Sequence, residues 1–166
     1  VYELDPASVQ VAKALKVKPG AKILDMCAAP GGKSLAKIFE LRGQANWVLN
    51  DVSEDRVHRL RRVVKEYVPE NLLSQIHITK RDASRWGLYE PASYDCVLLD
   101  APCSGERHML MNKSEMSHWS VKRTKGLKQR QYALLCAAAQ TVKPGGQIVY
   151  ATCSISPMEN DEVIAR

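Results

Sequence analysis

The segment AKILDMCAAPGGKS, residues 21–34, decides the predicted fold. Its first six residues form a short run that is mostly apolar, and two glycines then permit a tight turn. A helical pattern follows from Lys33 to about Leu41. A strand, a glycine turn and a helix in this order are typical of the start of a βαβ unit. The first expectation is therefore an α/β protein.

The alternation of strands and helices extends to both sides of this segment. Asp5 and Pro6 predict the N-cap and first residue of a helix that runs to about Val17. Ser53 predicts the cap of a basic amphipathic helix that ends near Tyr67. A further helix is predicted over 127–142, ended by KPGG at 143–146, and further strands are predicted over 47–51, 75–79, 94–100 and 147–152. Five strands alternating with helices predict a doubly wound, mostly parallel sheet with right-handed crossovers.

Composition is that of a globular protein. With 166 residues, 45% hydrophobic and 25% charged, we expect one domain over residues 1–166, and we exclude disorder, collagen and coiled coil. No apolar run reaches the roughly 18 residues of a membrane span, so no membrane partner is expected. The chain starts without Met and stops inside a predicted helix after the fifth strand. We therefore expect a truncated domain that lacks its carboxyl-terminal strands.

The charge and the cysteines narrow the chemistry. The net charge of +6 is compatible with a polyanionic partner without requiring one. An odd number of cysteines without a C-x-x-C motif or a secretion signal argues against a disulfide framework and a zinc site, and for a reducing, intracellular location. We therefore expect no metal, and His108 and His118 lack ligand spacing and receive no role.

The five cysteines fall into two kinds. Cys96 and Cys136 lie in apolar stretches and are interpreted as buried side chains. Cys103 and Cys153 lie in polar turn sequences directly after predicted strands. Because adjacent strands bring their ends together, we expect these two thiols in one pocket, with a redox disulfide between them as the weaker alternative.

Acidic residues also follow the strands, at the sheet edge where such folds bind ligands. Residues 32–34, GKS, resemble the end of a Walker loop, but Cys27 occupies the position of its first glycine, and the pattern G-x-G-x-x-G also fails. What remains is a glycine turn at a helix N-terminus, with Asp51 at the end of the next strand. This arrangement predicts a cofactor that contains a nucleoside, and a tight turn without a ligand is the alternative.

Three motifs now carry a resemblance. ILDMCAAPGGKS at 23–34, DAPCSG at 100–105 and TCS at 152–154 resemble the cofactor and cysteine motifs of the Sun/Fmu family of RNA cytosine-5 methyltransferases. The similarity covers most of the chain. PMEN at 157–160 resembles the Glu-Asn extension of that family, and residues 1–8 resemble its branch with the mitochondrial ribosomal-RNA enzymes. The resemblance implies a Rossmann-like S-adenosylmethionine-dependent methyltransferase fold with S-adenosylmethionine as cofactor.

The resemblance also implies roles for individual residues. Cys153 would be the nucleophile that adds to carbon 6 of cytosine, Asp100 would hydrogen-bond the base, and Cys103 would assist elimination. Asp51 would bind the ribose hydroxyls and Asp82 the adenine amine, while Lys33 is left open between the cofactor, the acid cluster and the RNA. The implied cofactor site comprises Cys27, Ala28, Ala29, Pro30, Gly31, Gly32, Lys33, Asp51, Asp82 and Asp100.

The target base has to leave its stack, and contacts to the RNA backbone must offset that cost. We expect those contacts from a basic group in the loop before the helix that precedes the fifth strand: Lys122, Arg123, Lys125, Lys128 and Arg130. A second group is interpreted as a solvated helix face: Arg56, Arg59, Arg61 and Arg62. The expected partner is rRNA or tRNA, with a separate RNA-binding protein or domain as a further possibility.

Two other functions stay open at this point. One is a non-catalytic RNA-binding or ribosome-assembly subunit with a vestigial cofactor pocket. The other is a DNA cytosine-5 methyltransferase, whose nucleophile lies in a Pro-Cys motif like residues 102–103, although the second cysteine at Cys153 argues against it. The sequence does not choose between a mitochondrial and a cytoplasmic or nucleolar location.

Overall fold

Five parallel strands form one sheet in the computed structural model, which describes residues 3–105 and 120–166. The strand order is β3-β2-β1-β4-β5, and each neighbouring pair is parallel. This topology confirms the predicted Rossmann-like α/β fold. The strands are β1 (Ala21–Asp25), β2 (Ala45–Asn50), β3 (Ile76–Thr79), β4 (Tyr94–Asp100) and β5 (Val142–Ala151).

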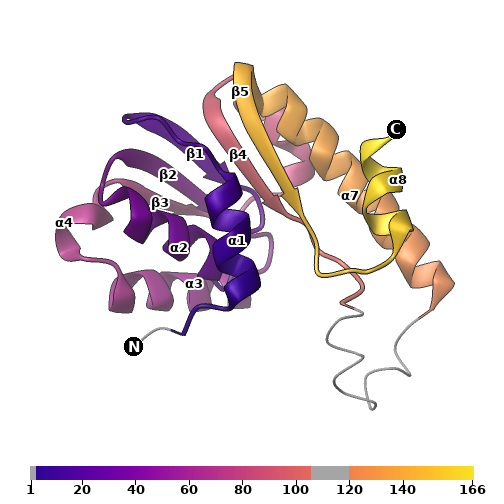
Figure 1. Ribbon diagram of the computed structural model, residues 1–166, viewed down its shortest axis with the longest axis horizontal. Coiled ribbons are helices and arrows are strands. Elements are labelled where there is room, and N and C mark those ends of the chain that lie inside the picture. Colours follow the sequence, from indigo (N-terminus) through magenta and orange to yellow (C-terminus); the bar gives the residue numbers. More distant parts are fainter. Residues whose placement is uncertain (1–2, 106–119) are drawn as a thin grey trace.

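Helices cover both faces of the sheet (Figure 1). The long ones are α1 (Pro6–Ala14), α2 (Gly32–Leu41), α3 (Glu54–Tyr67) and α7 (Val121–Thr141). The short ones are α4 (Glu70–Leu73), η1 (Ala83–Arg85), α5 (Trp86–Tyr89), η3 (Pro157–Glu159) and α8 (Asp161–Ile164).

Successive residues of the central strands supply two separate cores, because side chains alternate between the faces of a strand. Ile23 is buried with Leu35 of α2 and Leu60 of α3. Its neighbour Leu24 is buried on the opposite face with Leu134 of α7. The central strands β1, β2 and β4 are therefore buried on both faces, as predicted for residues 94–100, while the edge strands β3 and β5 are only partly covered.

The boundaries of three elements differ from the prediction by three residues or more. Helix α1 ends at Ala14 instead of Val17, because Leu15 adopts an extended conformation and is fully buried. Helix α7 begins at Val121 instead of Leu127, since the Ser120 side chain caps it by accepting the Arg123 N–H. The basic residues 122–130 therefore lie on a helix, and their predicted placement in a loop was wrong.

Strand β5 is longer than predicted at its start. It begins at Val142, so residues 143–146 belong to the strand. The helix before them ends at Thr141, within one residue of the predicted end. Pairing with β4 runs from Tyr94↔Val142 to Asp100↔Ala151, with a register shift between Tyr94↔Val142 and Cys96↔Gln147. This irregularity accommodates Pro144 and two glycines that a regular ladder would exclude.

The order of the strands fixes where a ligand can bind. Strand β1 pairs with β2 on one side and with β4 on the other, so the connections leave in opposite directions at this point. In open α/β sheets the crevice at such a switch point, beyond the carboxyl ends of the strands, is the usual ligand site. Among the described residues, no helix combines the length and the apolar character needed to cross a membrane.

Candidate active site

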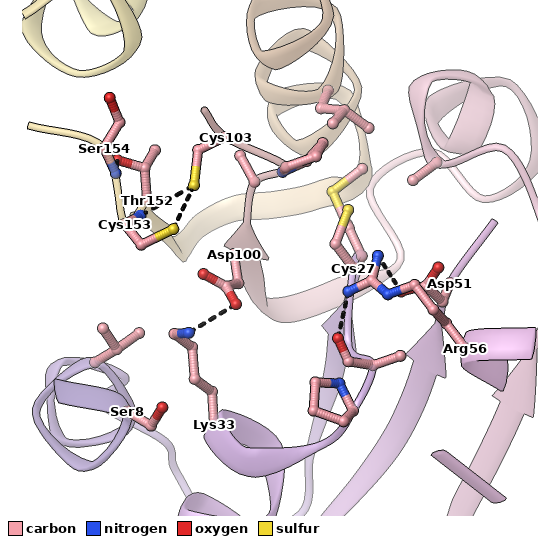
Figure 2. A pocket seen from close by; sticks show the side chains of 18 of the residues that line it. Ser8, Cys27, Lys33, Asp51, Arg56, Asp100, Cys103, Thr152, Cys153 and Ser154 are labelled. Atoms are coloured by element: carbon pink, nitrogen blue, oxygen red, sulfur yellow. Dashed lines mark hydrogen bonds and ion pairs between the residues drawn. The ribbon is translucent and has the colours of Figure 1, made fainter. Parts of the chain in front are cut away.

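A cavity of about 790 Å³ lies at the carboxyl ends of β1, β2, β4 and β5 (Figure 2). Its volume is within the usual range for sites that bind small molecules and cofactors. The predicted site residues that line it are Cys27, Ala29, Pro30, Lys33, Asp51, Asp82, Asp100, Cys103, Arg130 and Cys153. Seven other predicted residues are absent from its lining: Ala28, Gly31, Gly32, Lys122, Arg123, Lys125 and Lys128.

The glycine turn between β1 and α2 forms one wall. Gly31 has φ = 118°, in the region that side chains rarely adopt, and a Cβ there would lie 3.1 Å from Cδ1 of Leu60. The turn is tied to β2, because the Ala28 N–H donates to the Asn50 carbonyl at 2.7 Å and the Asn50 amide donates to the Met26 carbonyl at 3.0 Å. Ala28 and Gly31 therefore give the turn its shape without lining the cavity.

Asp51 lies directly after β2 and is 1% exposed. Its Oδ1 accepts the Ser53 N–H at 3.1 Å. Its Oδ2 forms an ion pair with Nη1 of Arg56 at 3.0 Å but accepts no hydrogen bond within the described part of the chain. Buried carboxylate oxygens normally accept hydrogen bonds, so this oxygen beside a cavity fits a ligand that donates hydroxyl groups, as a ribose does.

Arg56 is a site residue that the sequence did not indicate. It was expected on a solvated helix face, but its guanidinium pairs with Asp51, donates to the Ala29 carbonyl and lines the cavity (Figure 2). It thereby connects the second strand end to the glycine turn. Its position one turn after the capping Ser53 was the available signal, because that spacing points a side chain back toward the helix N-terminus.

Burial controls the titration of the groups at the end of β1. Desolvation raises the pKa of Asp25 to about 7, although the Ser34 hydroxyl and the Cys27 N–H both donate to its carboxylate. Burial also raises the pKa of the Cys27 thiol to about 12, with further increases from the charges of Asp25 and Asp51. Cys27 therefore keeps its proton at neutral pH and is unsuited to act as a nucleophile.

Lys33 and Asp100 form an ion pair at 2.7 Å across the middle of the cavity, between the glycine turn and the thiols (Figure 2). This ion pair is a contact with the acid cluster, one of the three options left open for Lys33. Asp82 also lines the cavity. Its Oδ1 accepts two hydrogen bonds from Ser84, one from the backbone N–H at 3.1 Å and one from the side-chain hydroxyl at 2.8 Å.

The thiols of Cys103 and Cys153 lie together, as predicted, with their sulfur atoms 2.7 Å apart (Figure 2). The Cys153 N–H also points to Sγ of Cys103 at 3.3 Å. The contact with Cys153, followed by burial, raises the pKa of Cys103 above its ordinary value, so Cys103 holds its proton.

All five cysteines are free thiols. Cys96 is buried, at 4% exposure, as expected. Cys136 is only partly buried, which corrects its interpretation as a core side chain. It lies outside the buried stripe of α7, which includes Gln131, Leu134 and Ala138.

Helix α1 supplies another wall that the sequence did not indicate. Ser8 and Val11 line the cavity on the side of Lys33. Asp5 also lines it, and its carboxylate caps the helix by accepting the Ser8 N–H at 3.2 Å. The capping signal predicted the helix, but nothing local in the sequence indicated where the helix would pack.

The basic residues of α7 differ in their surroundings. Lys122, Arg123 and Lys125 are exposed on its first turns, and Lys128 forms an ion pair with Glu162 of α8. Of the five residues in this group, Arg130 lines the cavity. His108 and His118 lie outside the described residues. Within the described chain, no group of three or more His, Cys, Asp or Glu side chains could hold a metal ion.

The five-stranded topology, the glycine turn and the acid after β2 define the S-adenosylmethionine-dependent methyltransferase class of Rossmann-like proteins. Residues 12–166 match the family model described as 16S rRNA methyltransferase RsmB/F. The chain therefore belongs to the RsmB/F methyltransferase family, which confirms the resemblance seen in its motifs. Membership of this methyltransferase family supports S-adenosylmethionine as the cofactor, as predicted.

Three relatives show how far the similarity extends. The chain is 40% identical to 5-cytosine rRNA methyltransferase NSUN4 of Bos taurus, over 98% of this chain and 43% of that protein. It is 40% identical to the mitochondrial tRNA (cytosine(34)-C(5))-methyltransferase of Danio rerio, over 98% and 44%. It is 36% identical to ribosomal RNA small subunit methyltransferase B of Xanthomonas campestris, over 96% and 36%. The chain thus spans less than half the length of these curated relatives.

Two solved structures are similar to this chain over almost its whole length. The crystal structure of PH0851 superposes with a TM-score of 0.90 at 30% identity, over 99% of this chain and 36% of that one. NSun6 from Pyrococcus horikoshii with SFG superposes with a TM-score of 0.81 at 27% identity, over 99% and 41%.

Proposed function

We propose that residues 1–166 form the catalytic domain of an enzyme that methylates carbon 5 of cytosine in RNA, through a covalent bond between Cys153 and carbon 6. One observation carries this proposal. Two thiols lie 2.7 Å apart in the same cavity as the buried, hydrogen-bond-deficient carboxylate of Asp51. A nucleoside cofactor and a covalently bound base could therefore share one cavity.

The glycine-turn end would hold the cofactor. Asp51 would accept hydrogen bonds from the ribose hydroxyls and Asp82 one from the adenine amine. Cys27, Ala29 and Pro30 would enclose the rest, on a turn shaped by Ala28, Gly31 and Gly32. Arg56 fixes Asp51 against the turn. When bound, S-adenosylmethionine would supply the electrophilic methyl group that carbon 5 takes up.

The thiol end would activate the base. The Cys153 thiolate adds to carbon 6, and the electron pair moves toward carbon 5, which is otherwise a poor nucleophile. We assign the attack to Cys153, because its motif at 152–154 resembles the family's cysteine motif, and we assign an assisting role to Cys103, whose sulfur lies 2.7 Å away. Cys103 would assist the later elimination, in which the carbon 5 proton passes to water, its electron pair re-forms the ring double bond and Cys153 departs as a thiolate.

Asp100 would bind the base between these two ends. Its carboxylate can accept a hydrogen bond from the exocyclic amine of cytosine. The ion pair with Lys33 holds this carboxylate in the middle of the cavity. Lys33 compensates the charge of Asp100, which lowers the cost of desolvating this carboxylate when the base enters.

We propose RNA, either rRNA or tRNA, as the partner. Arg130 would contact its backbone beside the cavity, and Lys122, Arg123, Lys125 and Lys128 would contact it farther along α7. A separate RNA-binding part would supply further affinity, because the relatives extend well beyond the region matched here. An intracellular location follows from this partner, and relatives described as mitochondrial favour the mitochondrion.

The test is methyl transfer from S-adenosylmethionine with a labelled methyl group to total RNA by the full-length protein, followed by identification of the labelled nucleoside. We expect labelled 5-methylcytidine. A protein that binds both S-adenosylhomocysteine and RNA but transfers no label would instead be a binding subunit with a vestigial pocket. Transfer to DNA alone would contradict the RNA assignment.

A further inference from the structure

Two loops carry the two thiols, and a third segment holds both of them. Cys103 lies in the loop after β4, and Cys153 lies in the loop after β5. The third segment is η3 together with Asn160, which follows the β5 loop. Its side chains bind Ser104, after Cys103, and residues on both sides of Cys153, while Gln131 of α7 binds the carbonyl before Cys103.

Glu159 and Gln131 hold the loop of Cys103. The Glu159 Oε2 accepts the Ser104 N–H at 3.0 Å and the Gln131 amide at 2.7 Å. The same Gln131 amide donates to the Pro102 carbonyl at 2.9 Å. The residues immediately before and after Cys103 are therefore both attached to this pair, and both members of the pair are fully buried.

Asn160 holds the loop of Cys153 in the same manner. Its Oδ1 accepts the Thr152 hydroxyl at 2.6 Å, and its Nδ2 donates to the Ser154 carbonyl at 3.0 Å and to the Ser156 carbonyl at 3.1 Å. The residues immediately before and after Cys153 thus share one side chain as their partner.

We call these two groups of hydrogen bonds, one made by Glu159 and Gln131 and one made by Asn160, the clamp. Both belong to one structural unit, because Glu159 and Asn160 are adjacent in the chain. The Tyr150 hydroxyl donates to the Glu159 carbonyl at 2.7 Å, which fixes this turn to β5. A direct contact also joins the loops, since the hydroxyls of Ser104 and Ser154 lie 3.3 Å apart.

We infer that Glu159 and Asn160, supported by Gln131, are positioning residues that set the distance between the two thiols. A buried carboxyl group is costly unless polar groups compensate it, and a neutral apolar core would avoid that cost. Here the carboxyl instead binds a backbone N–H next to Cys103. Covalent catalysis needs its reacting groups held within about 0.5 Å of the productive geometry, and such a clamp provides that. The effect of these residues on catalysis rests on the proposed function, whereas their effect on the distance between the thiols does not.

The rate at which the two thiols form a disulfide tests the distance without any methylation. Oxidised glutathione reacts with one thiolate and releases one glutathione, and the second cysteine then displaces the other glutathione and closes the Cys103–Cys153 bond. We expect the closure step in the full-length Glu159→Ala protein to be at least about tenfold slower than in the wild type. Asp161→Asn, an exposed change two residues away, is the control and should close at the wild-type rate.

The catalytic consequence needs a second readout. Glu159→Ala should lower kcat for RNA methylation at least about tenfold and leave KM for S-adenosylmethionine within about twofold, because the clamp does not touch the cofactor end. Glu159→Gln keeps an oxygen that can accept from Ser104 and Gln131, so both closure and kcat should return to within about threefold of the wild type. Asn160→Ala, at a partly exposed position, replaces Glu159→Ala if that variant does not fold.

The outcomes separate the two proposals. Wild-type closure rates in folded Glu159→Ala or Asn160→Ala would overturn the positioning role, whatever happens to methylation. Slow closure in these variants, together with a wild-type protein that methylates no RNA, would keep the positioning role and overturn the proposed function.

Discussion

The two ends of the cavity are built in different ways. The glycine-turn end joins the turn after β1 to the end of β2 and the start of α3, which belong to consecutive strand–helix units, and backbone hydrogen bonds shape much of it. The thiol end brings together the loops after β4 and β5 with Gln131 and Glu159, and side-chain hydrogen bonds hold it. A local change should therefore disturb the first end less than the loss of one buried side chain disturbs the second.

The cysteines at the two ends of the cavity show how the surroundings change the properties of one residue type. Cys27 at the glycine-turn end is surrounded by acids, and its pKa of about 12 keeps it protonated. Cys103 and Cys153 at the other end touch each other, and this contact raises the pKa of Cys103. The surroundings of each thiol, and not the residue type, determine which one can react.

The largest effect is expected at the thiol end. Cys153→Ala should lower methyl transfer at least about 10⁴-fold, roughly 5.5 kcal/mol of barrier, because no adduct can form. Cys103→Ala should instead let the adduct form and accumulate as a protein–RNA species, since elimination is impaired. Radiolabel transfer and denaturing gels measure the two effects. A stalled adduct in Cys153→Ala but not in Cys103→Ala would exchange the two roles.

The second largest effect concerns stability at the end of β1. The pKa of Asp25 is raised from 3.8 to about 7 in the folded protein, so between these pH values the folded state holds a proton that the unfolded chain has lost. The contribution of Asp25 to the free energy of unfolding is therefore complete below about pH 4 and decreases as the pH rises through about 7, by about 4 kcal/mol in total. Asp25→Asn should remove this slope in urea unfolding between pH 4 and 8.

An exposed acid provides the control for that experiment. Asp161→Asn should leave the pH dependence of the wild type intact, since Asp161 is exposed. If the Asp25→Asn and wild-type stabilities run parallel across this range, the carboxyl of Asp25 is not the group that titrates.

A smaller effect is expected for the cofactor. Asp51→Asn should raise the Kd of S-adenosylhomocysteine about 10- to 100-fold, or about 1.4–2.7 kcal/mol, because an amide oxygen is a weaker acceptor for two hydroxyls than a carboxylate. Calorimetry of the full-length protein measures the change. Asp55→Asn, exposed on the first turn of α3, should bind as the wild type does. Equal affinities in the two variants would remove Asp51 from the cofactor site.

The smallest effect is expected for RNA affinity. Arg130→Gln should raise the Kd for RNA about three- to tenfold, because it removes one phosphate contact. For the same reason the slope of log K against log salt concentration should become less steep by about one. Arg59→Gln, exposed on α3, should change neither quantity. Equal salt slopes for the two variants in a filter-binding titration would show that Arg130 makes no such contact.

The fold was largely predictable because its strands are short apolar runs bounded by turn residues. The run at 94–100 coincides with β4, and the acids and thiols that follow the strands meet at one cavity. The helix boundaries were less predictable. Residues 121–126 of α7 carry a polar, glycine-containing sequence whose helix depends on the Ser120 cap and on the buried Thr124.

The parts of the site that escaped prediction depend on contacts between distant residues. Arg56 reaches Ala29 across 27 positions, and Gln131 reaches Glu159 across 28. The spacing of Arg56 from Ser53 gives a direction for its side chain, but no local pattern names the partner of Arg56 or of Gln131, since each residue alone is typical of a helix. The resemblance of residues 157–160 to a family motif located Glu159 and Asn160, but the hydrogen bonds in the structure give them a role.

The most direct test of the account is the reaction of the full-length protein with S-adenosylmethionine and an RNA in which 5-fluorocytidine replaces cytidine. Fluorine cannot leave as a proton does, so elimination stops and the adduct remains. Digestion and mass spectrometry then identify the cysteine that carries a methylated fluorocytidine. The account predicts that this cysteine is Cys153. An adduct on Cys103, or methylation of ordinary RNA by a protein that forms no adduct with the fluorinated RNA, would contradict it.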